Sequence, residues 1–212
     1  MNRQPDSKRP KSLLLVHGAG SGPWVFDGWA ERFAHLMVAA PDLQAGLDLG
    51  GASMDDYTER VVEAGMRLPK PLALCGWSMG GLVAMMAAST LEPEALILIE
   101  ASAPGEVQGF DRTIRPRVGV FESEPVYGAF PPGVRSRPES QYARDERKRG
   151  ISVPSLPNRT LVVSGNEHSD ERGQQLAAFY GVSLSAFPTL SHWDLVRATS
   201  VAEEIQRFLA VE

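Results

Sequence analysis

The sequence has almost no cysteine, no excess of positive charge and no long apolar segment. Cys75 is the single cysteine among 212 residues, which excludes an internal disulfide and a cysteine-based zinc site. The formal net charge is −5, which argues against a general nucleic-acid binder. The apolar runs are far too short to span a bilayer. We therefore expect neither a nucleic-acid nor a membrane partner.

The first ten residues, MNRQPDSKRP, are polar and contain proline. They lack the apolar segment of a signal peptide, so we predict a disordered tail over residues 1–10 and a cytoplasmic protein. Hydrophobic residues make up 43% of the chain, which is enough material for one buried core. Residues 11–212 are therefore expected to form a single domain.

Short apolar runs alternate with helical patterns along most of the chain. Because strands that alternate with helices imply right-handed crossovers, this order predicts a mostly parallel sheet of about six strands with helices on both faces. The expected strands cover residues 12–18, 36–43, 71–77, 94–102, 159–165 and 183–190. The expected helical segments cover residues 23–35, 53–66, 79–90, 170–181 and 200–210.

The stretch from about residue 102 to residue 157 interrupts this alternation. It is rich in proline, glycine and charge and has no strong periodicity. Because a structureless loop of that length is unusual inside a compact domain, we predict a small inserted cap with one or two short helices. The best helix candidate is PESQYARDERKRG, residues 138–150.

Basic side chains are concentrated in the second half of this stretch. A basic cap would attract an anionic substrate or an acidic carrier protein. A solvated helix whose charges are balanced by Glu139, Asp145 and Glu146 is the alternative, and the sequence by itself favours it. The basic residues are Arg135, Arg137, Arg144, Arg147, Lys148 and Arg149.

Ser78 lies between Gly76 and Gly80, directly after an apolar run and before a helix-forming one. A nucleophile held in a strained strand-to-helix turn needs small flanking residues, because larger ones would collide with the neighbouring strand and helix. In this setting GWSMG, residues 76–80, resembles the nucleophile elbow of the α/β-hydrolase family. A plain tight turn is the alternative. The resemblance implies an α/β-hydrolase fold with Ser78 as the nucleophile.

A second motif, HGAGSGPW at residues 17–24, follows the first expected strand and resembles the oxyanion loop of the same family. The resemblance implies that the backbone amides of Ala19 and Met79 bind the developing oxyanion, and that His17 is structural. Met79 also lies at an expected helix N-terminus, whose dipole favours negative charge. A glycine-rich connecting loop without catalytic role is the alternative.

The general base is expected last, because the family runs nucleophile, acid, histidine along the chain. His192 alone among the four histidines follows the final expected strand, and a neutral imidazole can take the serine proton. The acid is ambiguous. Asp170 is the first choice, although it suits a helix cap equally well. Glu100, at the end of the fourth expected strand, is the second choice, and Glu167 is the third.

Three tryptophans, Trp24, Trp77 and Trp193, each adjoin one of these motifs. They are expected to line an apolar substrate pocket, or else simply to pack. The elbow resembles that of small single-domain esterases, including carrier-protein methyl ester esterases, and HGAGSGPW is similar to a stretch of plant methylesterases. The two leading antiparallel strands of full-length members are expected to be absent.

The resemblance implies a serine hydrolase that cleaves a small carboxylic ester through an acyl-enzyme, with neither a cofactor nor a metal. An acyl thioesterase or carrier-protein ester hydrolase would use the same residues. A non-catalytic binding protein on the same fold is a third possibility, because a fold does not fix a function.

Overall fold

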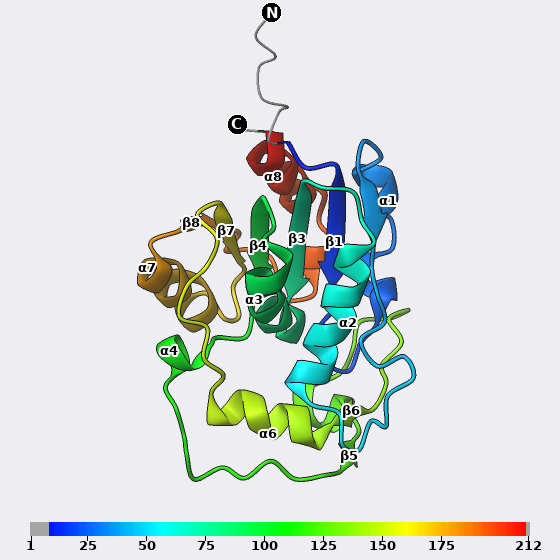
Figure 1. Ribbon diagram of the computed structural model, residues 1–212, viewed down its shortest axis with the longest axis vertical. Coiled ribbons are helices and arrows are strands. Elements are labelled where there is room, and N and C mark those ends of the chain that lie inside the picture. Colours follow the sequence, from blue (N-terminus) through cyan, green and yellow to red (C-terminus); the bar gives the residue numbers. More distant parts are fainter. Residues whose placement is uncertain (1–8, 211–212) are drawn as a thin grey trace, which may run out of the picture.

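The computed structural model describes residues 9–210, so residues 1–8 of the predicted tail lie outside the described part, as do residues 211–212. Six strands form one parallel sheet in the order β2-β1-β3-β4-β7-β8, which confirms the expected sheet (Figure 1). The strands are β1 Ser12–Val16, β2 Met37–Ala39, β3 Leu72–Trp77, β4 Ala95–Ile99, β7 Thr160–Ser164 and β8 Ser183–Ala186.

Helices cover both faces of the sheet, because its central strands carry apolar side chains in both directions. In β1, Leu14 and Val16 face one core, and Leu13 and Leu15 face the other. The first core is closed by α2, α3 and α7, and the second by α1 and α8 (Figure 1). These helices are α1 Trp29–Arg32, α2 Met54–Met66, α3 Met79–Leu91, α7 Leu176–Tyr180 and α8 Thr199–Ala210. In the described range, no helix has the length and apolarity needed to cross a bilayer.

Two of the expected helices form differently from the prediction. Residues 23–35 are not one helix: Gly28, with φ 83°, separates the 3-10 turn η1 Pro23–Phe26 from α1. Residues 170–181 begin as a π-helix, η2 Asp170–Gln175, and continue as α7. Gly181, with φ 65°, ends α7 in the left-handed conformation that glycine adopts without strain.

The segment between β4 and β7 lies beyond the carboxyl ends of the strands (Figure 1). It contains short helices and one antiparallel strand pair, and the helix expected within residues 138–150 forms as α6. Its division from the main domain as a cap over residues 102–157 stays a prediction. The elements are α4 Gly105–Gln108, β5 Val120–Phe121, α5 Glu124–Tyr127, β6 Glu139–Ser140 and α6 Gln141–Arg149.

Candidate active site

Ser78 occupies a sharp turn between β3 and α3. Its backbone has φ 57° and ψ −126°, a conformation that residues other than glycine rarely adopt. Hydrogen bonds hold the turn in place: the Ser78 amide donates to Ile99 O at 3.0 Å, and Ser78 O accepts from the amides of Gly81 and Ser102 at 3.0 and 2.8 Å. The strain is therefore compensated by contacts with the end of β4 and the residues after it.

The two glycines of the turn are required by close backbone contacts. A Cβ atom on Gly80 would lie 2.2 Å from Val16 O and 2.3 Å from His17 O, and one on Gly76 would lie 2.3 Å from Gly80 O. These are backbone atoms of α3 and of the end of β1, which cannot move aside as a flexible side chain can. The motif is therefore explained by packing at the point where α3 meets the sheet.

We expect Gly80→Ala to lower the free energy of unfolding by about 3 kcal/mol, because the added methyl group overlaps two carbonyl oxygens. Urea denaturation followed by circular dichroism measures the change. Gly51→Ala is the matched control, since a Cβ there meets no atom within 4 Å. Equal stability of the two variants would contradict the packing explanation.

The glycine-rich loop after β1 lies against Ser78. A Cβ atom on Gly18 would come within 2.9 Å of Ser78 Cβ, and Ala19 and Ser78 line the same cavity. Met79 is the first residue of α3, so its amide has no acceptor within the helix. In the part of the chain that the structure describes, no hydrogen bond occupies the amide of Ala19 or of Met79. Both amides are thus available to an oxyanion.

His17 is enclosed in this loop rather than in the cavity. Its Nδ1 lies 3.0 Å from Gly18 O, and its Nε2 accepts from the amide of Leu43 at 3.1 Å. Burial lowers the pKa of His17 to about 4, so the imidazole is neutral at neutral pH. The ring therefore links two loops, consistent with a structural role.

His192 is held by a buried carboxylate. Its Nδ1 lies 2.6 Å from Glu100 Oε2, and the Gly165 amide donates to Glu100 Oε1 at 2.7 Å. Burial alone would raise the pKa of Glu100, but the hydrogen bond and charge of His192, with the Gly165 amide, lower it overall. An ionised Glu100 favours the tautomer in which the Nδ1–H group of His192 donates a hydrogen bond to the carboxylate, and Nε2 is then the nitrogen that can take a proton.

The expectation that Asp170 would be the partner of His192 is wrong. Asp170 is exposed in the first turn of η2, and among residues 9–210 no hydrogen bond or ion pair joins it to His192. The Glu167 carboxylate accepts a hydrogen bond from the backbone amide of His192 at 3.2 Å, and among the described residues no hydrogen bond or ion pair joins it to the imidazole. Glu100, the second choice from the sequence, directly follows β4, and its carboxylate lies at the imidazole of His192 in the loop after β8.

Aromatic rings fix the position of His192. Trp77 stacks on the imidazole with ring centroids 4.8 Å apart, and its Nε1 donates to His192 O at 3.1 Å. Trp193 packs on Trp77 with centroids 4.7 Å apart. His192 and Ser78 line one cavity, although no hydrogen bond between their side chains occurs in the described region. Such bonds are often long without substrate, so the geometry is compatible with a nucleophile–base pair.

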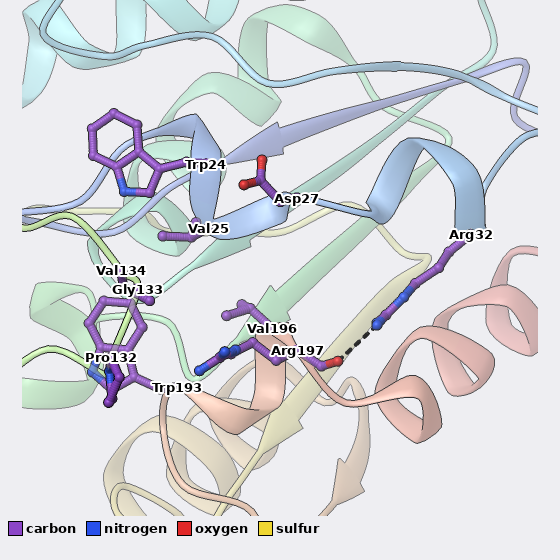
Figure 2. Close-up of a pocket in the computed structure, with 10 residues that line it drawn as sticks. All are labelled: Trp24, Val25, Asp27, Arg32, Pro132, Gly133, Val134, Trp193, Val196 and Arg197. Atoms are coloured by element: carbon purple, nitrogen blue, oxygen red, sulfur yellow. Dashed lines mark hydrogen bonds between the residues drawn. The ribbon is translucent and has the colours of Figure 1, made fainter.

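Trp24 does not belong to this cavity. It lines a neighbouring one, where Trp193 forms part of the wall (Figure 2). The Arg135 guanidinium lies 4.2 Å from the centroid of the Trp24 ring, and Trp24 Nε1 donates to Arg135 O. Trp77 and Trp193 line the cavity at Ser78, while a substrate-pocket role for Trp24 stays a prediction.

The cavity at Ser78 has a volume of about 300 Å³. Much of its wall comes from residues that the sequence did not mark as a pocket, contributed by α5, α6 and the segment around η2. The sequence singled out Arg147 and Glu167 for other roles, as a basic cap residue and a candidate acid, whereas Arg172 lies in the last turn of η2, where a cation is ordinary. The additional lining residues are Ser102, Val126, Tyr127, Phe130, Arg147, Glu167, His168 and Arg172.

The three acids expected to balance the charges of α6 form an ion pair or hydrogen bonds with groups outside this helix. Asp145 forms an ion pair with Arg117 at 2.9 Å, and Glu146 accepts from the amide of Met54. Glu139 is fully buried and accepts from Tyr57 Oη and from the amide of Gly20. Within the described residues, none of these three acids forms an ion pair with a basic side chain of α6, although the charge of Arg149 acts against the raised pKa of Glu146.

Relatives with assigned activities match about half of the chain. Pimeloyl-[acyl-carrier protein] methyl ester esterase of Yersinia pestis is 37% identical over 98 residues, and that of Nitrosomonas europaea is 34% identical over 104 residues. The matches cover 43% and 47% of this chain, and only 36% and 40% of those relatives. The similarity to them is therefore confined to part of each protein.

Solved structures resemble most of the chain. A pyrethroid hydrolase from Sphingobium faniae JZ-2 has a TM-score of 0.66 at 18% identity, covering 94% of this chain and 97% of that one. Polyneuridine aldehyde esterase has a TM-score of 0.65 at 17% identity, covering 95% and 98%. At such identities the likeness shows the fold. The sequence profile of the alpha/beta hydrolase family matches residues 13–210, and the chain belongs to that family.

Proposed function

We propose that this protein is a serine hydrolase that cleaves a small carboxylic ester through an acyl-enzyme, with Ser78, His192 and Glu100 as its triad. The observation that carries the proposal is the 2.6 Å contact between His192 Nδ1 and the buried Glu100 carboxylate, beside the cavity that Ser78 lines. A buried carboxylate at Nδ1 fixes the tautomer in which Nε2 accepts a proton. Neither a cofactor nor a metal is needed for this chemistry.

The proposed reaction has two steps. His192 Nε2 takes the proton of Ser78 as Oγ attacks the ester carbonyl, and the amides of Ala19 and Met79 donate to the resulting oxyanion. The bond to the alkoxy oxygen then breaks, and His192 returns the proton to the leaving alcohol. A water molecule, deprotonated by His192, attacks the acyl-enzyme and releases the carboxylic acid and free Ser78.

A thioester or carrier-protein-linked substrate is the second candidate for the same residues. The relatives named as carrier-protein methyl ester esterases favour it, as do the basic side chains of α6. A purely binding role is less well supported, because the carboxylate partner of His192 is in contact with it. The cytoplasmic location stays a prediction of the sequence.

Reaction with a fluorophosphonate tests the nucleophile directly. We expect one covalent adduct, located on Ser78 by mass spectrometry of the digested protein, because only a serine activated by an adjacent base attacks the phosphorus centre readily. Ser102→Ala is the control, since Ser102 lines the same cavity and should not be needed for labelling. An adduct on another residue, or none, would contradict the proposal.

A further inference from the structure

The cavity at Ser78 contains two arginines, Arg147 from α6 and Arg172 from η2. Both also line an adjoining recess of about 180 Å³, together with Arg144 and Lys148. The two cavities share Ser102, Tyr127, Arg147 and Arg172. The recess is therefore a basic extension of the space in which Ser78 would meet its substrate.

Within residues 9–210, no ion pair joins a carboxylate to Arg147 or Arg172, although Glu167 and Glu171 line the two cavities. Glu100, the remaining carboxylate nearby, already binds His192 and the Gly165 amide. The charges of Glu171 and Glu100 act on Arg172 from a distance, but neither carboxylate forms an ion pair with it within the described residues.

Donor atoms of both side chains are also unused. The Nε atoms of Arg147 and Arg172 are buried and have no hydrogen-bond partner, while Arg147 Nη2 donates to Tyr127 Oη at 2.9 Å. Burial lowers the pKa of Arg172; the charge of Glu171 opposes this, and that of Arg147 adds to it. Leaving a buried charge and its donors without partners is costly, unless a ligand supplies the missing acceptors.

We propose that Arg147 and Arg172 bind an anionic group, a carboxylate or a phosphate, at the far end of the acyl substrate of Ser78. The planar guanidinium groups suit both anions, because each can donate two parallel hydrogen bonds to a pair of oxygens. This inference rests on the proposed function for its substrate, but the anion site itself can be tested without turnover.

A matched pair of esters tests the preference. Mono-p-nitrophenyl esters of dicarboxylic acids are compared with neutral p-nitrophenyl esters of the same acyl length, over a series of increasing length. We expect kcat/KM to be at least about tenfold higher for the anionic ester at the best length, and the advantage to shrink with added salt. No preference at any length would overturn the proposal.

Substitution of each arginine shows whether the preference comes from this pair. Arg147→Gln and Arg172→Gln should lower kcat/KM for the anionic ester by about tenfold to a hundredfold, and leave the neutral ester within about twofold. Arg149→Gln is the matched control, because Arg149 is exposed on the same helix and lines neither cavity. Equal losses on both esters would indicate a structural role and overturn the proposal.

Binding to the Ser78→Ala protein separates this proposal from the hydrolase proposal. Calorimetric titration with glutarate and with inorganic phosphate should show saturable binding that Arg172→Gln weakens by at least about tenfold. Tighter binding of glutarate would assign a carboxylate, and tighter binding of phosphate a phosphorylated acyl group. Inactivity on every ester with binding retained would refute only the hydrolase function, whereas absence of binding of either probe would overturn the anion site.

Discussion

Ser78→Ala should lower kcat for p-nitrophenyl ester hydrolysis by about five orders of magnitude, and His192→Ala by a similar factor. The hydroxyl is the attacking atom and the imidazole its base, so the loss of either one removes the covalent route. The double variant should be little worse than either single variant, because the two residues act as a unit. Steady-state kinetics on highly purified protein, with the uncatalysed rate subtracted, measures all three.

Ser102→Ala is the informative control for this loss. Ser102 lines the cavity, and its backbone amide donates to Ser78 O, but the substitution keeps that amide. Its kcat should therefore stay within about threefold of wild type, the size of effect expected for a residue outside the reaction. If Ser78→Ala retained wild-type activity, the hydrolysis would come from another group, and the proposed mechanism would be wrong.

The sheet and the position of Ser78 were predictable because they depend on local pattern. Apolar runs closed by glycine mark strands buried on both faces, and the order of strand, glycine-flanked serine and helix fixes the turn that raises Ser78. Gly80 shows why the pattern is reliable, since any larger residue there would meet the backbone of β1.

The acid was not predictable with the same certainty, because three carboxylates follow the ends of strands. Chain order brings Glu100, Glu167 and Asp170 to the same edge of the sheet, but it does not say where their side chains point. The direction of the Glu100 side chain depends on the backbone of Glu100 itself, which has φ 39°, an unusual conformation for a residue other than glycine. The choice between the three carboxylates is thus a tertiary property.

The residues that line the cavity could also not be predicted from the sequence. Trp24 adjoins the oxyanion loop in sequence, yet its ring lines the neighbouring cavity (Figure 2). The Arg135 guanidinium lies over that ring. Arg147 and Arg172 are separated by a strand and two loops, and they meet only because α6 and η2 both lie at the carboxyl end of the sheet. Proximity in sequence to a motif is a poor guide to which side chains share a cavity.

Glu100→Gln should lower kcat by about four orders of magnitude, the size of effect seen when a triad carboxylate becomes an amide. The amide can still accept from Gly165, but it offers an NH₂ group or a weaker acceptor to His192 Nδ1. That reverses the tautomer preference and removes the charge that stabilises the imidazolium. The lowered pKa of Glu100 means that wild type keeps this charge throughout a neutral-pH assay. Kinetics on p-nitrophenyl esters, with circular dichroism as a check on folding, measures the effect.

Asp170→Asn makes the same chemical change at the carboxylate that the sequence alone ranked first. It should leave kcat within about threefold of wild type, because an exposed side chain with no contact to His192 cannot set its tautomer. Glu167→Gln should behave likewise, since Glu167 reaches only the backbone amide of His192. A folded Glu100→Gln protein with normal activity, beside an inactive Asp170→Asn, would reverse the assignment. The pair of variants therefore tests whether the direction of one side chain at the end of β4, rather than its place in the chain order, decides which carboxylate serves the imidazole.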